Sequence, residues 1–125
     1  GNIFNRRSLI GIDNLANAIC RCLTHPKAPG ETFLVSDGED VSTPDLARSI
    51  ARKMKKRLYM APVSPALLET MLWLIGKSST ARRLLGSLTL DSSHIHNTLG
   101  WCPPRSLDDG LQKTVAWYRN QRKSE

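Results

Sequence analysis

The chain has 125 residues, of which 40% are hydrophobic, and it carries a formal net charge of +7. This length allows one domain, and the hydrophobic content favours a folded chain over a disordered one. The apolar runs are interrupted well before about 18 residues, so we expect no transmembrane helix. The positive charge is dispersed in short clusters, and we expect neither nucleic acid nor a membrane as partner.

The start of the sequence and its cysteines both bear on where the protein works. The chain opens with Gly1 and shows no charged leader before an apolar stretch, so we expect no signal peptide and a cytoplasmic protein. The opening resembles the middle of a longer protein. The three cysteines are Cys20, Cys22 and Cys102. Their odd number and spacing predict reduced, structural thiols, and neither they nor His94 and His96 predict a metal site.

The first predicted elements are a short strand over residues 7–12 and an amphipathic helix after it. Asp13 is expected to cap this helix, and His25-Pro26 to end it. Its predicted apolar stripe is Leu15, Ile19, Cys22 and Leu23.

Residues 31–54 are interpreted as a strand, a turn and a helix. Residues 32–35 are β-branched or aromatic, which predicts a buried strand. Gly38 suits the turn, and Ser42 is expected to cap the next helix with Asp45 as its capping-box partner. The predicted inward face of that helix is Leu46, Ala47, Ile50, Ala51 and Met54. A strand followed by an amphipathic helix is half of a βαβ unit, which needs a sheet to join.

The middle of the chain predicts a strand at residues 58–63 and a helix that Pro65 opens. Apolar residues cover more than one face of this helix between 67 and 75, which predicts burial or a partner. Residues 81–85 predict one helical turn that carries Arg82 and Arg83.

The last third predicts a strand at residues 88–90 and two helices. Asp91 or Ser92 should cap the first helix, with Ile95 and Leu99 inward and Gly100 at its end. A capping box of Ser106 and Asp109 predicts the start of the second helix. The apolar stripe expected on that helix is Leu107, Leu111, Val115 and Tyr118.

Four motifs occur in an order that suggests a family: RSLIGIDNLANAI, GETFLVSDGEDVSTPDLARSIA, LTLDSSHIHNTLGW with two prolines, and LDDGLQKTVAWY. In this order they resemble the C-terminal portion of extended short-chain dehydrogenases/reductases. The most similar branch is that of the NAD-dependent nucleotide-sugar epimerases and dehydratases of bacterial surface-polysaccharide synthesis. The resemblance covers nearly the whole chain.

The resemblance implies an α/β fold of Rossmann type, of which residues 1–125 would form a single C-terminal, substrate-binding segment. The strand at residues 32–35 would join the edge of the nucleotide-binding sheet. Trp101 would be a packing anchor, and Asp91 would cap its helix. The N-terminal Rossmann half of the same enzyme would then be a partner. Because the strand would lack its sheet neighbours here, we expect self-association.

The chain also departs from the family pattern. It has no G-x-x-G-x-x-G motif, so NAD is expected in the full-length parent and not on this segment. It has no Tyr-x-x-x-Lys, because Tyr59 is followed by Val63 and Tyr118 by Arg122. We therefore expect no catalytic residue in this segment and no activity from it alone. Gly11 stands where many relatives carry histidine.

The resemblance also implies substrate-binding residues. Arg7 and Arg83 would bind the diphosphate of a nucleotide-sugar substrate, with Arg82 as the substitute for Arg83. Arginine suits this task because its planar fork holds two phosphate oxygens. C4 epimerisation of a UDP-sugar is the favoured activity of the parent, and dehydration is the alternative. A non-enzymatic basic binding module is the alternative of another class.

Overall fold

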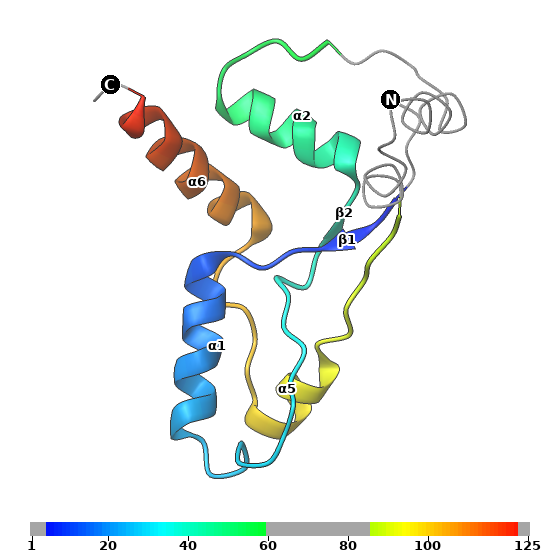
Figure 1. Cartoon of the computed structure of the whole chain (residues 1–125), viewed down its shortest axis with the longest axis vertical. Helices are drawn as coiled ribbons and strands as arrows, with labels where there is room; N and C mark the ends of the chain where they lie inside the picture. The colour runs from blue at the N-terminus through cyan, green and yellow to red at the C-terminus, as the bar shows by residue number, and fades with distance from the viewer. Residues whose placement is uncertain (1–4, 60–85, 123–125) are drawn as a thin grey trace, which may run out of the picture. The chain divides into compact units, whose positions relative to one another are not determined.

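The structure, a computed structural model, describes residues 5–59 and 86–122. Within these ranges the elements follow in the order β1, α1, β2, α2, α5 and α6 (Figure 1). The chain divides into two compact units. The "α1 unit" comprises Ser8–Asp40 and Thr89–Glu125, and the "α2 unit" comprises Gly1–Arg7 and Val41–Leu88. Strands β1 (Arg7–Ser8) and β2 (Asp40–Val41) form a two-stranded sheet.

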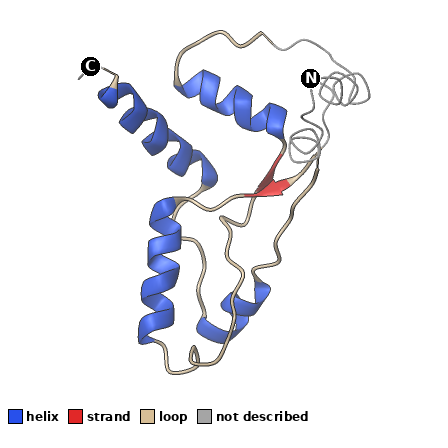
Figure 2. Cartoon of the chain, viewed as in Figure 1, coloured by secondary structure: helices blue, strands red, loops and turns tan. Residues whose placement is uncertain are grey.

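The described part of the α1 unit contains three helices, which are among those drawn in blue in Figure 2. They are α1 (Ile12–Thr24), α5 (Ser93–Leu99) and α6 (Leu107–Gln121). The prediction that Asp13 caps α1 is wrong, because Gly11 is the N-cap and Asp13 lies in the first turn. A carboxylate in that turn still interacts favourably with the positive end of the helix dipole. The helix ends before His25-Pro26, as predicted.

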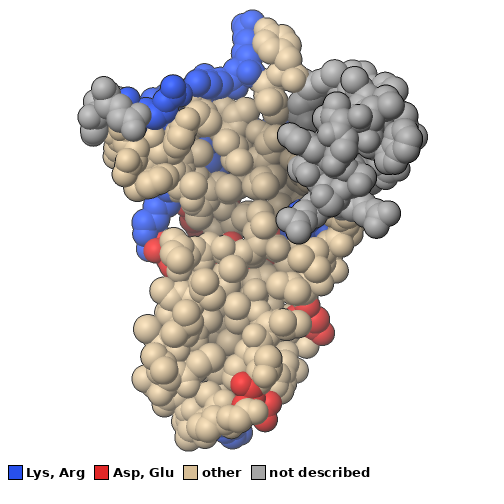
Figure 3. All heavy atoms as spheres, viewed as in Figure 1, with Lys and Arg blue, Asp and Glu red and all other residues tan. Residues whose placement is uncertain are grey.

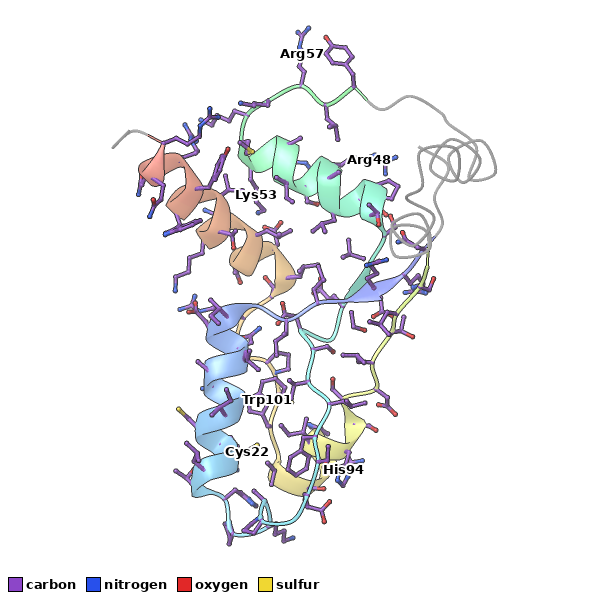
Figure 4. All side chains as sticks on the ribbon, viewed as in Figure 1. Cys22, Arg48, Lys53, Arg57, His94 and Trp101 are labelled. Atoms are coloured by element: carbon purple, nitrogen blue, oxygen red, sulfur yellow. The ribbon has the colours of Figure 1, made fainter. Side chains whose placement is uncertain are left out.

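The core of the α1 unit consists of Ala18, Ile95, Leu99 and Trp101. Ile95 and Leu99 are buried as predicted, and Gly100 ends α5 with a φ of 63°. Trp101 is 4% exposed, and its Nε1 donates to Asn17 Oδ1 on α1 at 2.9 Å (Figure 4). This geometry confirms Trp101 as a packing anchor, since its apolar body is buried and its one donor is satisfied.

The predicted apolar stripe of α1 is only partly correct. Ile19 and Leu23 are 50% and 80% exposed, while Asn14 and Ala18 are the buried residues of the helix. Cys22 is half-buried against the core. The inward face is therefore centred one residue earlier than hydrophobicity suggested. It can include a polar Asn14 because that side chain makes hydrogen bonds on both its amide atoms.

Several predicted strands are shorter in the structure or not formed. The structure assigns no strand to residues 32–35, so that prediction is wrong, although Phe33 and Val35 still pack on the core. Leu34 between them is 51% exposed. Residues 7–12 contribute only the two residues of β1, and residues 88–90 only a parallel bridge from Leu88 to Arg7. A strand assignment requires a paired neighbour, and the described residues provide none beside 32–35.

The described part of the α2 unit contains the helix α2 (Thr43–Lys53), and Ser42 is its N-cap as predicted. The Asp45 amide donates to Ser42 Oγ at 3.1 Å. The Asp45 carboxylate accepts from the Ser42 hydroxyl at 2.6 Å, a variation on the predicted capping box. The predicted inward face of α2, Leu46 to Met54, is half-buried. The elements predicted between 60 and 85 lie outside the described residues.

Helices α5 and α6 begin with different caps. The Asp91 carboxylate accepts from the Ser93 amide at 2.8 Å, while the Ser92 side chain makes no capping bond. The capping box of Ser106 and Asp109 is complete at the start of α6, as predicted. On the predicted stripe of α6, Val115 is buried and Tyr118 is 41% exposed.

Candidate functional site

Arg7 is the predicted binding residue that the structure describes, and it lies in the α2 unit at the start of β1. Its Nη2 donates to the carbonyl oxygen of Gly86 at 3.1 Å. Its Nε is buried and has no hydrogen-bond partner among the described residues. The guanidinium is thus anchored through one nitrogen, while a second N–H donor is unused. A buried donor without an acceptor costs about 1–3 kcal/mol.

The backbone around Arg7 is fixed by hydrogen bonds from its neighbours. The Arg6 amide donates to Ser87 Oγ at 3.0 Å, and the Leu88 amide donates to the Arg6 carbonyl at 2.8 Å. The strand that carries Arg7 therefore runs against residues 86–88. This pairing brings together two segments about eighty positions apart in the sequence.

Asn5 ties the same strand to α2. It is 3% exposed; its Nδ2 donates to Thr43 Oγ1 at 2.8 Å, and its Oδ1 accepts from the Thr43 amide at 2.9 Å. Thr43 is the first residue of α2, so Asn5 satisfies one of the amides left free at the helix start. Sequence reasoning missed Asn5, because no local pattern pairs it with a residue 38 positions away.

Arg82 and Arg83 lie between residues 60 and 85, outside the described residues. Their binding role and their proximity to Arg7 stay predictions. The described part of the α2 unit is nevertheless basic: the exposed cations after α2 are Lys55, Lys56 and Arg57. Figure 3 shows where basic side chains reach the surface of the chain, and Figure 4 labels Arg57. An anionic ligand would meet a favourable potential there.

A buried polar cluster in the α1 unit has a structural role. Asp37 is 5% exposed, and both of its carboxylate oxygens accept from the Gly11 amide at 3.0 Å. Asn14 Nδ2 donates to Asp37 Oδ1 at 2.6 Å and to the Arg105 carbonyl at 2.8 Å. The Arg105 amide donates back to Asn14 Oδ1 at 3.1 Å. These bonds join the start of α1 to two loops and leave the buried groups satisfied.

A cavity of about 520 Å³ lies beside this cluster, between the start of α1 and α6. Asp13 lines it and accepts from Lys113 Nζ at 2.6 Å, with Arg105 Nε at 3.5 Å. The Lys113 hydrogen bond, supported by the charges of Lys113 and Arg105, lowers the pKa of Asp13. A carboxylate held in its charged form by two cations is poorly suited to take up and release protons at neutral pH.

Among the described residues, no three side chains of the His, Cys, Asp and Glu types are placed to hold a metal ion. No helix in the described ranges is both long and apolar enough to span a membrane. The described tyrosines lack a lysine partner at the fourth following position. Tyr59 is 86% exposed, and Tyr118 lies 5.9 Å from the Arg122 guanidinium.

Comparison with known proteins gives relatives but no family model and no solved structure that matches. A UDP-glucose 4-epimerase of Vibrio cholerae is 44% identical over 111 residues, which are 89% of this chain and 34% of that protein. A dTDP-glucose 4,6-dehydratase of Escherichia coli is 25% identical over 122 residues, 98% of this chain and 33% of that protein. A UDP-glucose 4-epimerase of Mycolicibacterium smegmatis is 27% identical over 121 residues, 97% of this chain and 34% of that protein. The chain therefore spans about a third of the length of these relatives.

Proposed function

Because this chain belongs to the extended short-chain dehydrogenase/reductase family, we propose that it is the substrate-binding part of a nucleotide-sugar epimerase or dehydratase. The epimerases and dehydratases that are its relatives match it over about one third of their own length. The complete enzyme would act on a nucleotide-diphospho-sugar. C4 epimerisation of a UDP-sugar is the activity we favour, because the relative at 44% identity is a UDP-glucose 4-epimerase. A role in surface-polysaccharide synthesis is part of the proposal and rests on the family resemblance alone. Dehydration is the alternative, because dehydratases are also among the relatives.

NAD belongs to the remaining part of the enzyme in this proposal. The residues of this chain do not fit the cofactor, since the sequence has no glycine-rich phosphate cradle. The exposed Tyr59 and the arginine-paired Tyr118 also lack the lysine that would prepare a tyrosine for proton transfer. The chain by itself is therefore expected to bind no NAD and to catalyse no reaction. Its N-terminal Rossmann half would provide both functions.

The observation that carries the proposal is the state of the Arg7 guanidinium. One nitrogen is anchored to Gly86, and the buried Nε has no partner in the described ranges. The residue as a whole is only half-buried, so a phosphate would form charge-assisted hydrogen bonds with its guanidinium, and a small shift that uncovers Nε would satisfy this donor as well. Arg7 would therefore bind the substrate diphosphate. Arg83, or Arg82 in its place, would supply a second contact from the segment outside the described residues.

The test is substitution of Arg7 in the complete enzyme. Charge-assisted hydrogen bonds contribute about 1.5–3 kcal/mol each, so Arg7→Ala should weaken substrate binding by about ten- to a hundredfold. Arg7→Lys should recover only part of this loss, because an ammonium keeps the charge without the planar fork. Arg57→Ala is the matched control, since it removes one exposed cation from the same unit.

The substrate Michaelis constant and the thermal midpoint are recorded for each variant. Unchanged substrate affinity in Arg7→Ala, with the fold intact, would contradict the proposed role of Arg7. An equal loss in Arg57→Ala would also contradict it, because the effect would then be one of net charge. Arg83→Ala and Arg82→Ala extend the test to the second contact.

The basic α2 unit supports one other candidate, a non-enzymatic module that binds an anionic macromolecule. Such a module would bind an oligonucleotide with useful affinity and lose that affinity steeply as salt rises. A fluorescence titration with a labelled oligonucleotide at two salt concentrations separates the two functions. We expect only weak binding at low salt.

A further inference from the structure

Cys102 is paired with a histidine in the α1 unit. Its Sγ lies 3.1 Å from His96 Nδ1, within hydrogen-bond distance for sulfur. Gly100, with its φ of 63°, reverses the chain after α5 and so returns Cys102 to His96 six residues earlier. Both side chains are exposed, so reagents in solution can reach the pair. An imidazole in contact with a thiol is placed to take the thiol proton when the sulfur attacks a reagent.

Cys102 also lines an open cavity of about 430 Å³ between α1 and the turn at Gly100. Cys20 and Arg21 of α1 also line this cavity. Arg21 donates from Nε and Nη2 to the Leu99 carbonyl, at 3.0 and 2.8 Å, so its guanidinium is fixed at the wall. None of the residues that line the cavity is acidic. The cavity wall therefore carries one cationic side chain and no acidic one.

We propose that Cys102 is a modification site that reacts with anionic low-molecular-weight disulfides. In this reaction His96 Nδ1 takes the thiol proton, and the thiolate attacks one sulfur of the disulfide. The sulfur–sulfur bond of the reagent breaks as the new bond to Cys102 forms. The leaving thiolate then takes the proton from His96. Cys102 is oxidised, the released half of the reagent is reduced, and no further oxidant is needed.

The other two cysteines lack this combination of features. Cys22 is half-buried and packs against the core, which limits access to its sulfur. Cys20 is exposed and lines the same cavity beside Arg21, but no described histidine is hydrogen-bonded to it. Cys20 is thus an internal control that is exposed and lines the same cavity as Cys102. A difference in rate between the two sulfurs isolates the contribution of His96.

The experiment treats the reduced chain with oxidised glutathione at neutral pH, followed by acid quenching and peptide mass mapping at low conversion. Cys102 should react about tenfold faster than Cys20, because His96 Nδ1 lies 3.1 Å from its sulfur and can take the thiol proton as the sulfur attacks. His96→Asn should lower the Cys102 rate about tenfold and leave the Cys20 rate unchanged. The unchanged Cys20 rate and the far-ultraviolet circular dichroism show that the variant keeps its fold.

The charge preference is tested by comparing oxidised glutathione with uncharged hydroxyethyl disulfide and cationic cystamine. The anionic reagent should be preferred at Cys102, Arg21→Lys should keep this preference, and Arg21→Gln should reduce it. Equal rates at Cys102 and Cys20, or an unaltered Cys102 rate in His96→Asn, would overturn the proposed site. A preference for cystamine would overturn the role of Arg21.

Discussion

The two units of the chain differ in how their described residues are stabilised. The α1 unit has a core in which Ile95, Leu99 and Trp101 are each at most 4% exposed. In the described part of the α2 unit the buried residues are Asn5 and Pro44, and the apolar face of α2 is half-buried. Side-chain packing therefore dominates in the α1 unit, whereas hydrogen bonds from Asn5 and Ser42 order the start of the α2 unit.

This difference corresponds to a division of roles. Arg7, the proposed ligand of the substrate diphosphate, lies in the unit with less buried apolar surface. The buried polar atoms around Asn14 and Asp37 are all used internally, whereas Arg7 Nε is buried without a partner among the described residues. A hydrogen-bond donor without a protein partner is available to a ligand, whereas buried polar groups that are hydrogen-bonded to one another stabilise the fold.

The largest expected effect is on the core of the α1 unit. Leu99→Ala should lower the free energy of unfolding by about 2–5 kcal/mol, because it removes a side chain that is 1% exposed and leaves a cavity. Ile50→Ala on the half-buried face of α2 is the matched variant and should cost clearly less. Urea denaturation of both variants measures the contrast. An equal decrease in the free energy of unfolding in both variants would show that the α2 face is as well packed as the core.

The two buried asparagines sharpen the comparison. Asn14→Ala and Asn5→Ala should each lower the free energy of unfolding by about 1–3 kcal/mol, since each removes the hydrogen bonds of a buried side chain and leaves their partners to find others. Only Asn5→Ala should also weaken substrate binding in the complete enzyme, because Asn5 fixes the strand that carries Arg7. Thermal midpoints and Michaelis constants measured on both variants separate the two effects. A similar loss of substrate affinity in Asn14→Ala would contradict the division of roles.

The smallest expected effect on stability concerns two aspartates, the half-buried Asp13 in the α1 unit and the exposed Asp45 in the α2 unit. The hydrogen bond from Lys113 lowers the pKa of Asp13, and the Ser42 hydroxyl, followed by Arg48, lowers the pKa of Asp45. A carboxyl whose pKa is lower in the folded state stabilises the protein above its unfolded pKa of about 3.9. That contribution is lost as the pH falls through the lower native pKa.

Asp13→Asn and Asp45→Asn should therefore destabilise the protein slightly at pH 7 and progressively less as the pH falls below about 4. Added salt should reduce the destabilisation by Asp13→Asn more than that by Asp45→Asn. The largest cause of the lowered pKa is a hydrogen bond from the Lys113 cation at Asp13, but one from the neutral Ser42 hydroxyl at Asp45. Thermal midpoints across this pH range at low and high salt provide the measurement. A difference between wild type and variant that grows on acidification would contradict the assigned direction.

Features that depend on local sequence could be predicted. The caps at Ser42 and Ser106 follow from a side chain and an amide three residues apart, and the left-handed Gly100 follows from the needs of a helix end. Features that depend on distant partners could not. The burial of Asn14 requires Asp37, which is 23 residues away. The strand predicted at residues 32–35 requires a neighbouring strand that the described residues do not contain.

The candidate site could likewise be predicted only in its local features. The position of Arg7 at the start of a strand followed from sequence and family resemblance. Its anchor at Gly86, 79 residues away, and its support by Asn5 did not. Arg82 and Arg83 lie in the segment outside the described residues, where the structure does not place them relative to Arg7.

The central claim is that this chain is part of a nucleotide-sugar epimerase, and product analysis tests it most directly. The complete enzyme is incubated with NAD and UDP-glucose, and the nucleotide sugars are separated and identified by nuclear magnetic resonance. We predict a product of unchanged mass in which the configuration at C4 of the sugar is inverted. A product lighter by one water, from UDP-glucose or dTDP-glucose, would replace epimerisation by dehydration. Recovery of only unchanged nucleotide sugar would contradict the claim.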